Sequence, residues 1–159
     1  EVAGNHLTND LVVGLHAPFG IAEEIKIKYG HALPSTISPG EPVELTAFGD
    51  RPHTTVPRHY IARILEARAA ELFDLILREV KKSGYDGLLP AGVVLSGGTA
   101  QLAGLKELGQ QMLDLPVRTG RPQNVEGLME VIESPAYATG VGLLLWGMRH
   151  GQAPSSNRL

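Results

Sequence analysis

The chain has 159 residues, a formal net charge of −3 and no cysteine. Its length fits one domain, or one domain with an appended lobe, and an apolar fraction of 43% is enough to build a core. The slightly acidic balance argues against nucleic acid as a partner, and the lack of cysteine excludes disulfides and thiolate metal sites. The longest apolar run, residues 141–146, is too short to span a bilayer.

The first third of the chain shows helical spacing followed by a hairpin pattern. Thr8 is expected to act as an N-cap, Pro18 opens a second helix and Gly30 closes it. Gly49 and Asp50 lie between two alternating stretches and favour a hairpin turn. The predicted elements are helices 8–15 and 18–29, a Pro- and Ser-rich loop 33–40, and strands 43–48 and 53–56.

The rest of the chain alternates long helices with short strands. The longest predicted helix covers residues 57–83, and its apolar positions recur at helical spacing. These positions are Ile61, Ile64, Leu65, Leu72, Leu75, Ile76 and Val80. The elements predicted after it are a buried strand 93–95, helix 102–112, strand 115–118, loop 120–127, an apolar helix 136–148 and a polar tail 151–159. This alternation predicts an α/β fold.

Two glycines, Gly97 and Gly98, separate the strand 93–95 from the helix that follows. Without Cβ atoms, their backbone can lie flat against a base or a phosphate, and a strand, a glycine turn and a helix are a common arrangement at nucleotide sites. Such a turn also carries glycine for purely local reasons. The motif alone therefore leaves both explanations open.

Three other features have a functional and a structural interpretation. Glu23 and Lys26 are three residues apart and share a helix face, which suits the hydroxyls of a ribose but is more often a solvated ion pair. Gly4, ahead of a helix, either approaches an anion or forms a tight turn. Gly140 and Gly142, in the last helix, favour close packing against a neighbour.

Other catalytic and metal-binding patterns do not occur. The 6 histidines never fall at i and i+4 on one predicted helix, so we expect no zinc site. Ser96 does not stand in a G-x-S-x-G motif, and the sequence contains no Walker A motif. Arg58, Arg63 and Arg68 are spread around the long helix; such arginines are usually solvated, although one or two can grip a carboxylate of a partner.

Taken in chain order, several motifs match one family. Residues 94–102 (VLSGGTAQL) are similar to the adenosine motif of the actin, heat-shock-chaperone and sugar-kinase ATPase superfamily. Residues 2–11 resemble the segment after its second phosphate hairpin, and residues 22–30 the helix whose Glu and Lys contact the nucleoside. The stretches 115–118, 127–128 and 134–144 are similar to one member, the bacterial cell-division protein FtsA. The chain thus resembles the C-terminal part of the FtsA family.

This resemblance implies a partial actin-like (ribonuclease-H-like) ATPase lobe with a small helix-plus-hairpin subdomain. Residues 1–150 correspond to subdomain 2B and part of 2A, and residues 151–159 to a disordered tail. The chain does not begin with Met, so we expect a fragment.

The resemblance also implies site residues. Glu23 and Lys26 are expected to touch the ribose of a bound nucleotide, and Gly97, Gly98 and Thr99 the adenosine and inner phosphate. Gln101 stands where the chaperones have a base-stacking arginine. On the long helix, three residues are implied in binding the C-terminal tail of the tubulin-like protein FtsZ: Arg68 as the main contact, with Arg63 and Glu71 as neighbours.

The family role is to recruit FtsZ to the membrane at the division site, where the protein is cytoplasmic and peripheral, binds ATP with magnesium and polymerises. The phosphate loops and the membrane segment are not among these 159 residues, so we expect no catalysis and at most weak ATP binding. Two alternatives stay open. One is a small ATPase or kinase of the same superfamily, and the other is a rod-shape or pilus-assembly relative.

Overall fold

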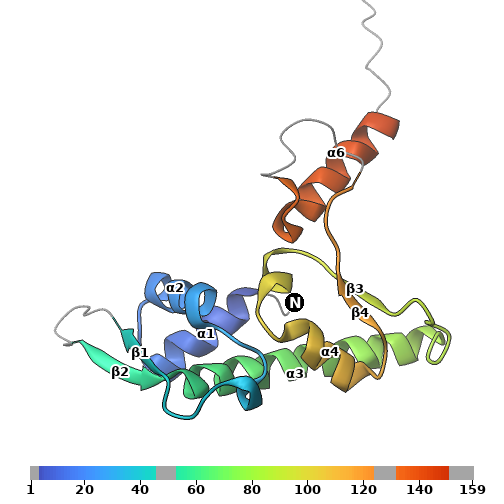
Figure 1. Ribbon diagram of the computed structural model, residues 1–159. Helices are drawn as coiled ribbons and strands as arrows, with labels where there is room; N and C mark the ends of the chain where they lie inside the picture. Colours follow the sequence, from blue (N-terminus) through green and yellow to red (C-terminus); the bar gives the residue numbers. More distant parts are fainter. Residues whose placement is uncertain (1–3, 46–52, 124–131, 151–159) are drawn as a thin grey trace, which may run out of the picture.

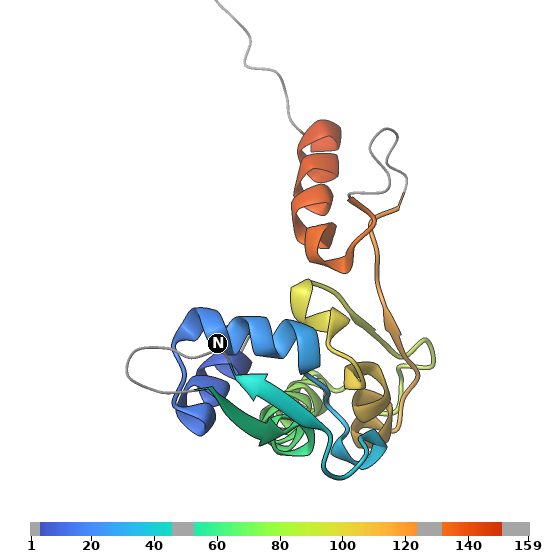
Figure 2. The ribbon, with the colours of Figure 1, turned by 60° about the vertical axis from the view of Figure 1, so that its left-hand side comes forward.

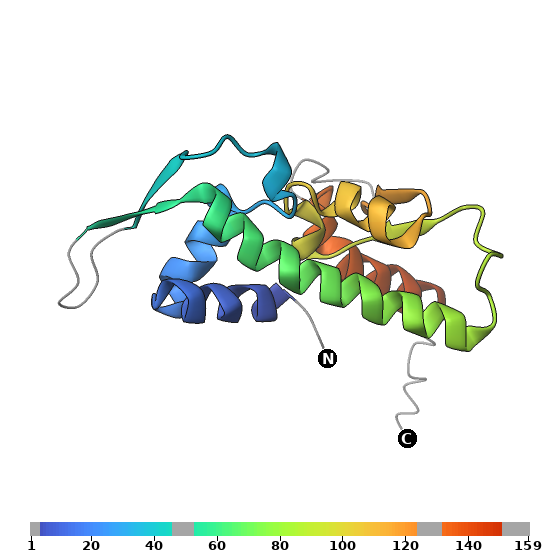
Figure 3. The same cartoon turned by 90° about the horizontal axis from the view of Figure 1, so that it is seen from below.

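Helix α3 (Arg58–Ser83) is the longest described helix, and α1, α2, α4 and the hairpin are grouped along it (Figures 1 and 3). The computed structural model describes residues 4–45, 53–123 and 132–150. Within these ranges the other helices are α1 (Gly4–Leu15), α2 (Phe19–Tyr29), α4 (Leu105–Leu113) and α6 (Ala138–His150). The short 3-10 turns are η1 (Pro34–Thr36), η2 (Gly98–Gln101) and η3 (Pro135–Tyr137).

Two small sheets complete this mixed α/β structure. Strands β1 (Pro42–Leu45) and β2 (Thr54–Pro57) pair antiparallel, with Val43 opposite Val56, so the predicted hairpin is confirmed (Figure 2). Its predicted turn lies outside the described residues. Strands β3 (Val93–Leu95) and β4 (Val117–Thr119) pair in parallel, and α4 lies between them in the sequence.

Two apolar clusters lie one after the other along α3. The first half of the helix contributes Ile61 and Leu65, which pack with α1, α2 and β1. Further along the helix, Ala69 and Phe73 pack with α4 and β4. The predicted apolar stripe is therefore confirmed at five positions that pack in these clusters: Ile61, Ile64, Leu65, Leu72 and Ile76. It is wrong at Leu75, which is 39% exposed, and it omits Phe73, which is fully buried.

Some predicted element ends are wrong, for identifiable physical reasons. Helix α1 already includes Gly4, so Thr8 is not its N-cap but a fully buried residue of its second turn. The helix predicted over 102–112 begins three residues later, as α4 at Leu105, because Gly104 adopts the left-handed φ of +76° and residues 102–104 only connect η2 to α4. Gly30 ends α2 with extended backbone, and it must be glycine because a Cβ there would overlap the carbonyl oxygen of Lys26.

Helix α6 stands apart from the other helices, and none of its residues is buried (Figures 1 and 2). The glycine packing expected there is not found among the described residues, since nothing lies within 4 Å of a Cβ added at Gly140 or Gly142. The predicted burial of β3 is also only partial, because Val94 is exposed. In the described part of the chain, no helix has the length and apolar character needed to cross a membrane.

Candidate functional site

A cleft of about 720 Å³ opens between the start of α1, one face of α2 and the η2 turn. The chain brings three distant segments together here: Gly4 at the start of α1, Glu23 and Lys26 on α2, and Gly98 and Thr99 in η2. All five line the cleft. The charged pair of α2 therefore faces the glycine turn, as the sequence motifs predict.

The ammonium group of Lys26 organises the floor of this cleft. Its Nζ donates to Glu23 Oε2 at 2.7 Å, to Thr8 Oγ1 at 2.8 Å and to the carbonyl oxygen of Gly4 at 3.3 Å. The Thr8 hydroxyl donates in turn to the same carboxylate oxygen of Glu23. Because an ammonium has three donors, these contacts use all of them. Lys26 thus ties α1 to α2 and fixes the orientation of Glu23.

Glu23 is held in its charged form. Burial alone would raise the pKa of this carboxyl, but hydrogen bonds from Lys26 and Thr8, with the Lys26 charge, lower the pKa overall. Its second oxygen, Oε1, has no hydrogen-bond partner in the described ranges, and the side chain is 34% exposed. Glu23 therefore offers one free carboxylate oxygen to a hydroxyl of a ligand.

The opposite wall is the η2 turn. Gly98 is open to solvent, since nothing lies within 4 Å of a Cβ placed on it. Thr99 lies against Gly4, and a Cβ on Gly4 would overlap the Thr99 hydroxyl unless that side chain turned away. Gly97 adopts φ +87° and donates its N–H to the carbonyl of Pro135 at 2.9 Å, which holds the turn.

A second set of charged groups lies where α3 packs against α1. Arg68 donates from Nε to Asp10 Oδ2 at 2.6 Å and from Nη2 to Asp10 Oδ1 at 3.0 Å, which is a bidentate pair. Its Nη1 donates to Glu71. The hydrogen bond to Asp10 raises the pKa of Arg68. The side chain of Arg68 is 27% exposed, against 28% for Asp10 and 53% for Glu71.

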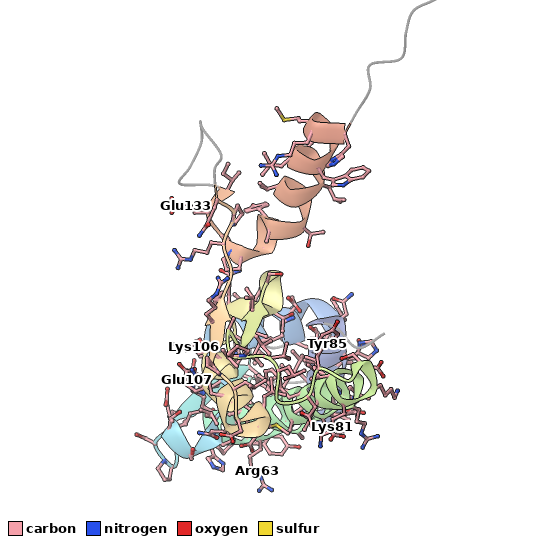
Figure 4. All side chains as sticks on the ribbon, turned by 90° about the vertical axis from the view of Figure 1, so that its right-hand side faces the viewer. Arg63, Lys81, Tyr85, Lys106, Glu107 and Glu133 are labelled. Carbon is pink, nitrogen blue, oxygen red and sulfur yellow. The ribbon has the colours of Figure 1, made fainter. Side chains whose placement is uncertain are left out.

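Arg63 lies on another side of α3. Five residues separate it from Arg68, which places the two about 140° apart around the helix. Its exposed side chain extends away from the fold (Figure 4), and it forms no ion pair with any described residue. Glu71 stands between the two arginines in helical projection. The three predicted residues therefore spread over about 140° of the circumference of α3, and the structure joins only Arg68 and Glu71.

Comparison with known proteins decides the family. The family model described as "Cell division protein FtsA" matches residues 1–142. The chain belongs to the FtsA family. Three similar relatives are the cell division protein FtsA of Pseudomonas aeruginosa (43% identical over 93% of this chain), Neisseria meningitidis (42% over 89%) and Escherichia coli K12 (35% over 99%). The resemblance predicted from the sequence motifs is thus confirmed.

The chain spans only a part of each FtsA relative. It covers 36% of the length of the Pseudomonas protein, 34% of the Neisseria protein and 40% of the Escherichia protein. The match does establish that the chain is a piece of a cell-division protein.

Sequence reasoning missed two residues of the FtsA cleft. The sequence predicts Thr8 as a helix cap, but its hydroxyl is buried between Lys26 and Glu23 of α2. This role becomes visible only when α1 and α2 are packed together in the fold. The sequence predicts Arg58 to be one of three arginines spread around the long helix, but in the fold it lines the cleft. Its Nη1 donates to Glu41 at 2.9 Å and its Nε to the carbonyl of Tyr29 at 2.9 Å. No local pattern marks either role.

Proposed function

We propose that this piece of an FtsA-family protein docks the C-terminal tail of FtsZ on helix α3, with Arg68 gripping a carboxylate of the tail. In this role the chain links FtsZ to the division machinery and carries no catalytic function. The proposal goes beyond the cell-division role that family membership establishes.

The observation that carries the proposal is the carboxylate-binding geometry of Arg68. The guanidinium already binds two carboxylates, one of them in the bidentate arrangement that a planar fork favours. A guanidinium has five N–H donors, and these contacts use three. The group is also partly exposed, so a peptide carboxylate can reach it.

Arg63 and Glu71 extend the proposed surface along α3. An extended peptide rises roughly 3.3 Å per residue, so a few residues span the distance from Arg68 to Arg63. Arg63, which forms no ion pair within the described ranges, offers its positive charge to an acidic residue of the tail. Glu71 occupies Nη1 of Arg68, so the tail carboxylate must approach the guanidinium from another side. We infer that the tail orders on binding, as short linear peptides do.

The test is titration of the chain with a synthetic peptide of the FtsZ C-terminal tail. We expect Arg68→Glu to weaken binding about tenfold or more, because it replaces an attraction with a repulsion. Arg78→Glu is the matched control: Arg78 lies on the same helix, is more exposed and pairs with Asp74 at 2.7 Å. Equal affinity of wild type and Arg68→Glu would overturn the assignment.

We infer a second function for the cleft, as the nucleoside half of an ATP site in the whole protein. The supporting observation is that Glu23 presents a free carboxylate oxygen opposite the open backbone of Gly98. In this proposal Glu23 accepts from a ribose hydroxyl, Lys26 holds Glu23, and Gly97, Gly98 and Thr99 form the wall for adenosine and the inner phosphate. Gln101, which is exposed on the same wall, lacks the charge of a base-stacking arginine.

A nucleotide titration distinguishes this proposal from its alternatives. We expect the 159-residue chain to bind ATP with magnesium weakly or not at all, because the residues given supply no phosphate loop. Tight, magnesium-dependent binding with turnover would instead favour a small ATPase or kinase. Binding of a rod-shape or pilus protein in place of FtsZ would instead favour the alternative that the chain belongs to a rod-shape or pilus-assembly relative.

Family membership also supports the wider setting. We infer that the described residues belong to subdomain 2B and part of 2A of an actin-like fold. On this proposal the whole protein polymerises and lies on the inner face of the cell membrane at the division site.

A further inference from the structure

Helix α1 touches both proposed sites at once. On one side, Gly4 and Thr8 contact Lys26 in the nucleotide cleft. On the other side, Asp10 binds Arg68 of α3. Further along, the hydroxyl of Tyr60 on α3 donates to the carbonyl of Gly14 at 3.4 Å. The carboxylate on Arg68 therefore comes from the helix that also forms the floor of the cleft.

The structure shows Arg68 with its charge already neutralised from within the chain. One positive guanidinium faces two carboxylates, so the group of Arg68, Asp10 and Glu71 carries a net charge of about −1. A third carboxylate, from a peptide, would have to enter against this excess negative charge. A site with this excess of negative charge does not attract an acidic peptide until Asp10 or Glu71 releases the guanidinium of Arg68.

Asp10 is the stronger of the two internal carboxylates. It engages two nitrogen atoms of Arg68, whereas Glu71 engages one. Asp10 is also less exposed than Glu71 and comes from another element, 58 residues away in sequence. Glu71 is an i,i+3 neighbour with a largely solvated side chain, and such pairs contribute little.

We propose that Asp10 is an internal competitor of the tail carboxylate for Arg68, so that the chain restrains its own docking site. The inference rests on the proposed docking of an acidic tail at Arg68. The tail carboxylate takes the Nε/Nη2 edge of the guanidinium when Asp10 releases it. Because Asp10 and Thr8 lie on one rigid helix, displacement of α1 from the cleft side changes how firmly Arg68 is held.

The test is the affinity of the Asp10→Asn variant for the acidic FtsZ tail peptide. Removal of the competing charge is expected to tighten binding about three- to tenfold at low salt. The gain is expected to shrink in high salt, because a contest between charges is screened. Asp74→Asn is the matched control: it removes one carboxylate from the pair with Arg78 on α3 and should leave the affinity within about twofold.

The possible outcomes separate this inference from the proposed function. If Arg68→Glu weakens peptide binding and Asp10→Asn strengthens it, both stand. If Arg68→Glu weakens binding while Asp10→Asn leaves it unchanged or weakens it, the competitor role is overturned and the docking site remains. If Arg68→Glu has no effect, docking at Arg68 itself is wrong. Thermal unfolding reports whether Asp10→Asn folds, and Asp10→Ser replaces it in the titration if it does not.

Discussion

At the scale of single residues, the surroundings of His31 disfavour the charged form of its imidazole. It lies between α2 and η1, where its Nδ1 accepts the N–H of Leu33 at 3.0 Å. Burial lowers the pKa of His31 below its ordinary value of 6.5, and the nearby charge of Arg58 lowers it further. Glu107 of α4 acts in the opposite direction without reversing the shift. The folded chain therefore favours the neutral imidazole.

This shift predicts how the free energy of unfolding depends on pH. The unfolded chain takes up a proton at His31 near its ordinary value of 6.5, before the folded chain does. The contribution of His31 to stability is thus complete above that pH and is lost as the pH falls through the lower, folded pKa. We expect urea denaturation to show a smaller free energy of unfolding at about pH 5.5 than at about pH 7.5.

The variant His31→Asn isolates this contribution. Its side-chain oxygen can still accept from Leu33, but it does not titrate, so the decline in stability below neutral pH should become shallower. His53→Asn removes an exposed histidine of the hairpin and serves as the control. If His31→Asn and His53→Asn reduced the pH dependence of the free energy of unfolding equally, the assignment of this dependence to His31 would be wrong.

The residue roles show where sequence reasoning succeeds. Glu23 and Lys26 were placed together because a spacing of three puts side chains on one helix face. The contacts of Thr8 and Asp10 were missed because their partners are 18 and 58 residues away. Polar contacts between elements depend on how helices pack, and no local pattern encodes them.

At the scale of elements, the close contact between α4 and α3 depends on a glycine in α4. Gly109 of α4 faces the ring of the fully buried Phe73, and a Cβ at Gly109 would lie 2.7 Å from Phe73 Cζ. Glycine lowers helix propensity, so an alanine would ordinarily stabilise an interior helical position. Here the packing against Phe73 decides the effect instead.

We therefore predict that Gly109→Ala lowers the free energy of unfolding by about 1–3 kcal/mol, as overpacking of a core does. Gly20→Ala in α2 is the matched control, because nothing lies within 4 Å of a Cβ there. Chemical denaturation should find the control unchanged or slightly more stable. A stabilised Gly109→Ala variant would show that α4 and α3 are not packed as the structure has them.

The type of most elements followed from periodicity, but their ends did not. The long helix and the second hairpin strand are exceptions, predicted within one residue at each end, whereas the predicted end of the first hairpin strand lies outside the described residues. The break at Gly104 was missed since glycine in a helical pattern has several meanings. Two features of the fold require glycine at this position: the left-handed φ of +76°, and the ring of His31, whose Cε1 would lie 2.5 Å from a Cβ placed there.

At the scale of the whole molecule, the described residues form two apolar clusters on α3 and a helix outside both. Helix α6 carries exposed apolar side chains, among them Leu143, Leu144, Trp146 and Met148. Its predicted helical spacing is confirmed, while the close packing predicted from its glycines is not. Sequence alone shows that such a helix is apolar. It does not show which surface covers it.

Whether α6 unfolds separately from the two clusters can be tested directly, because the chain has 1 tryptophan and that residue lies on α6. Trp146 is 64% exposed and stacks on His150, with ring centroids 5.1 Å apart. A helix of 13 residues without buried contacts is marginal in water. We predict that tryptophan emission is that of a hydrated indole and changes at lower denaturant than the main circular dichroism transition.

The control moves the probe into the part of the fold that α3 organises. In a Trp146→Phe background, Tyr60→Trp places the indole on α3 beside Gly14 of α1, and its emission should follow the circular dichroism transition. Coincident transitions for Trp146 and for the backbone would mean that α6 unfolds together with the two clusters. That result would contradict the separate α6 of the structure, since a helix stabilised only by its own backbone hydrogen bonds loses them independently of the clusters on α3.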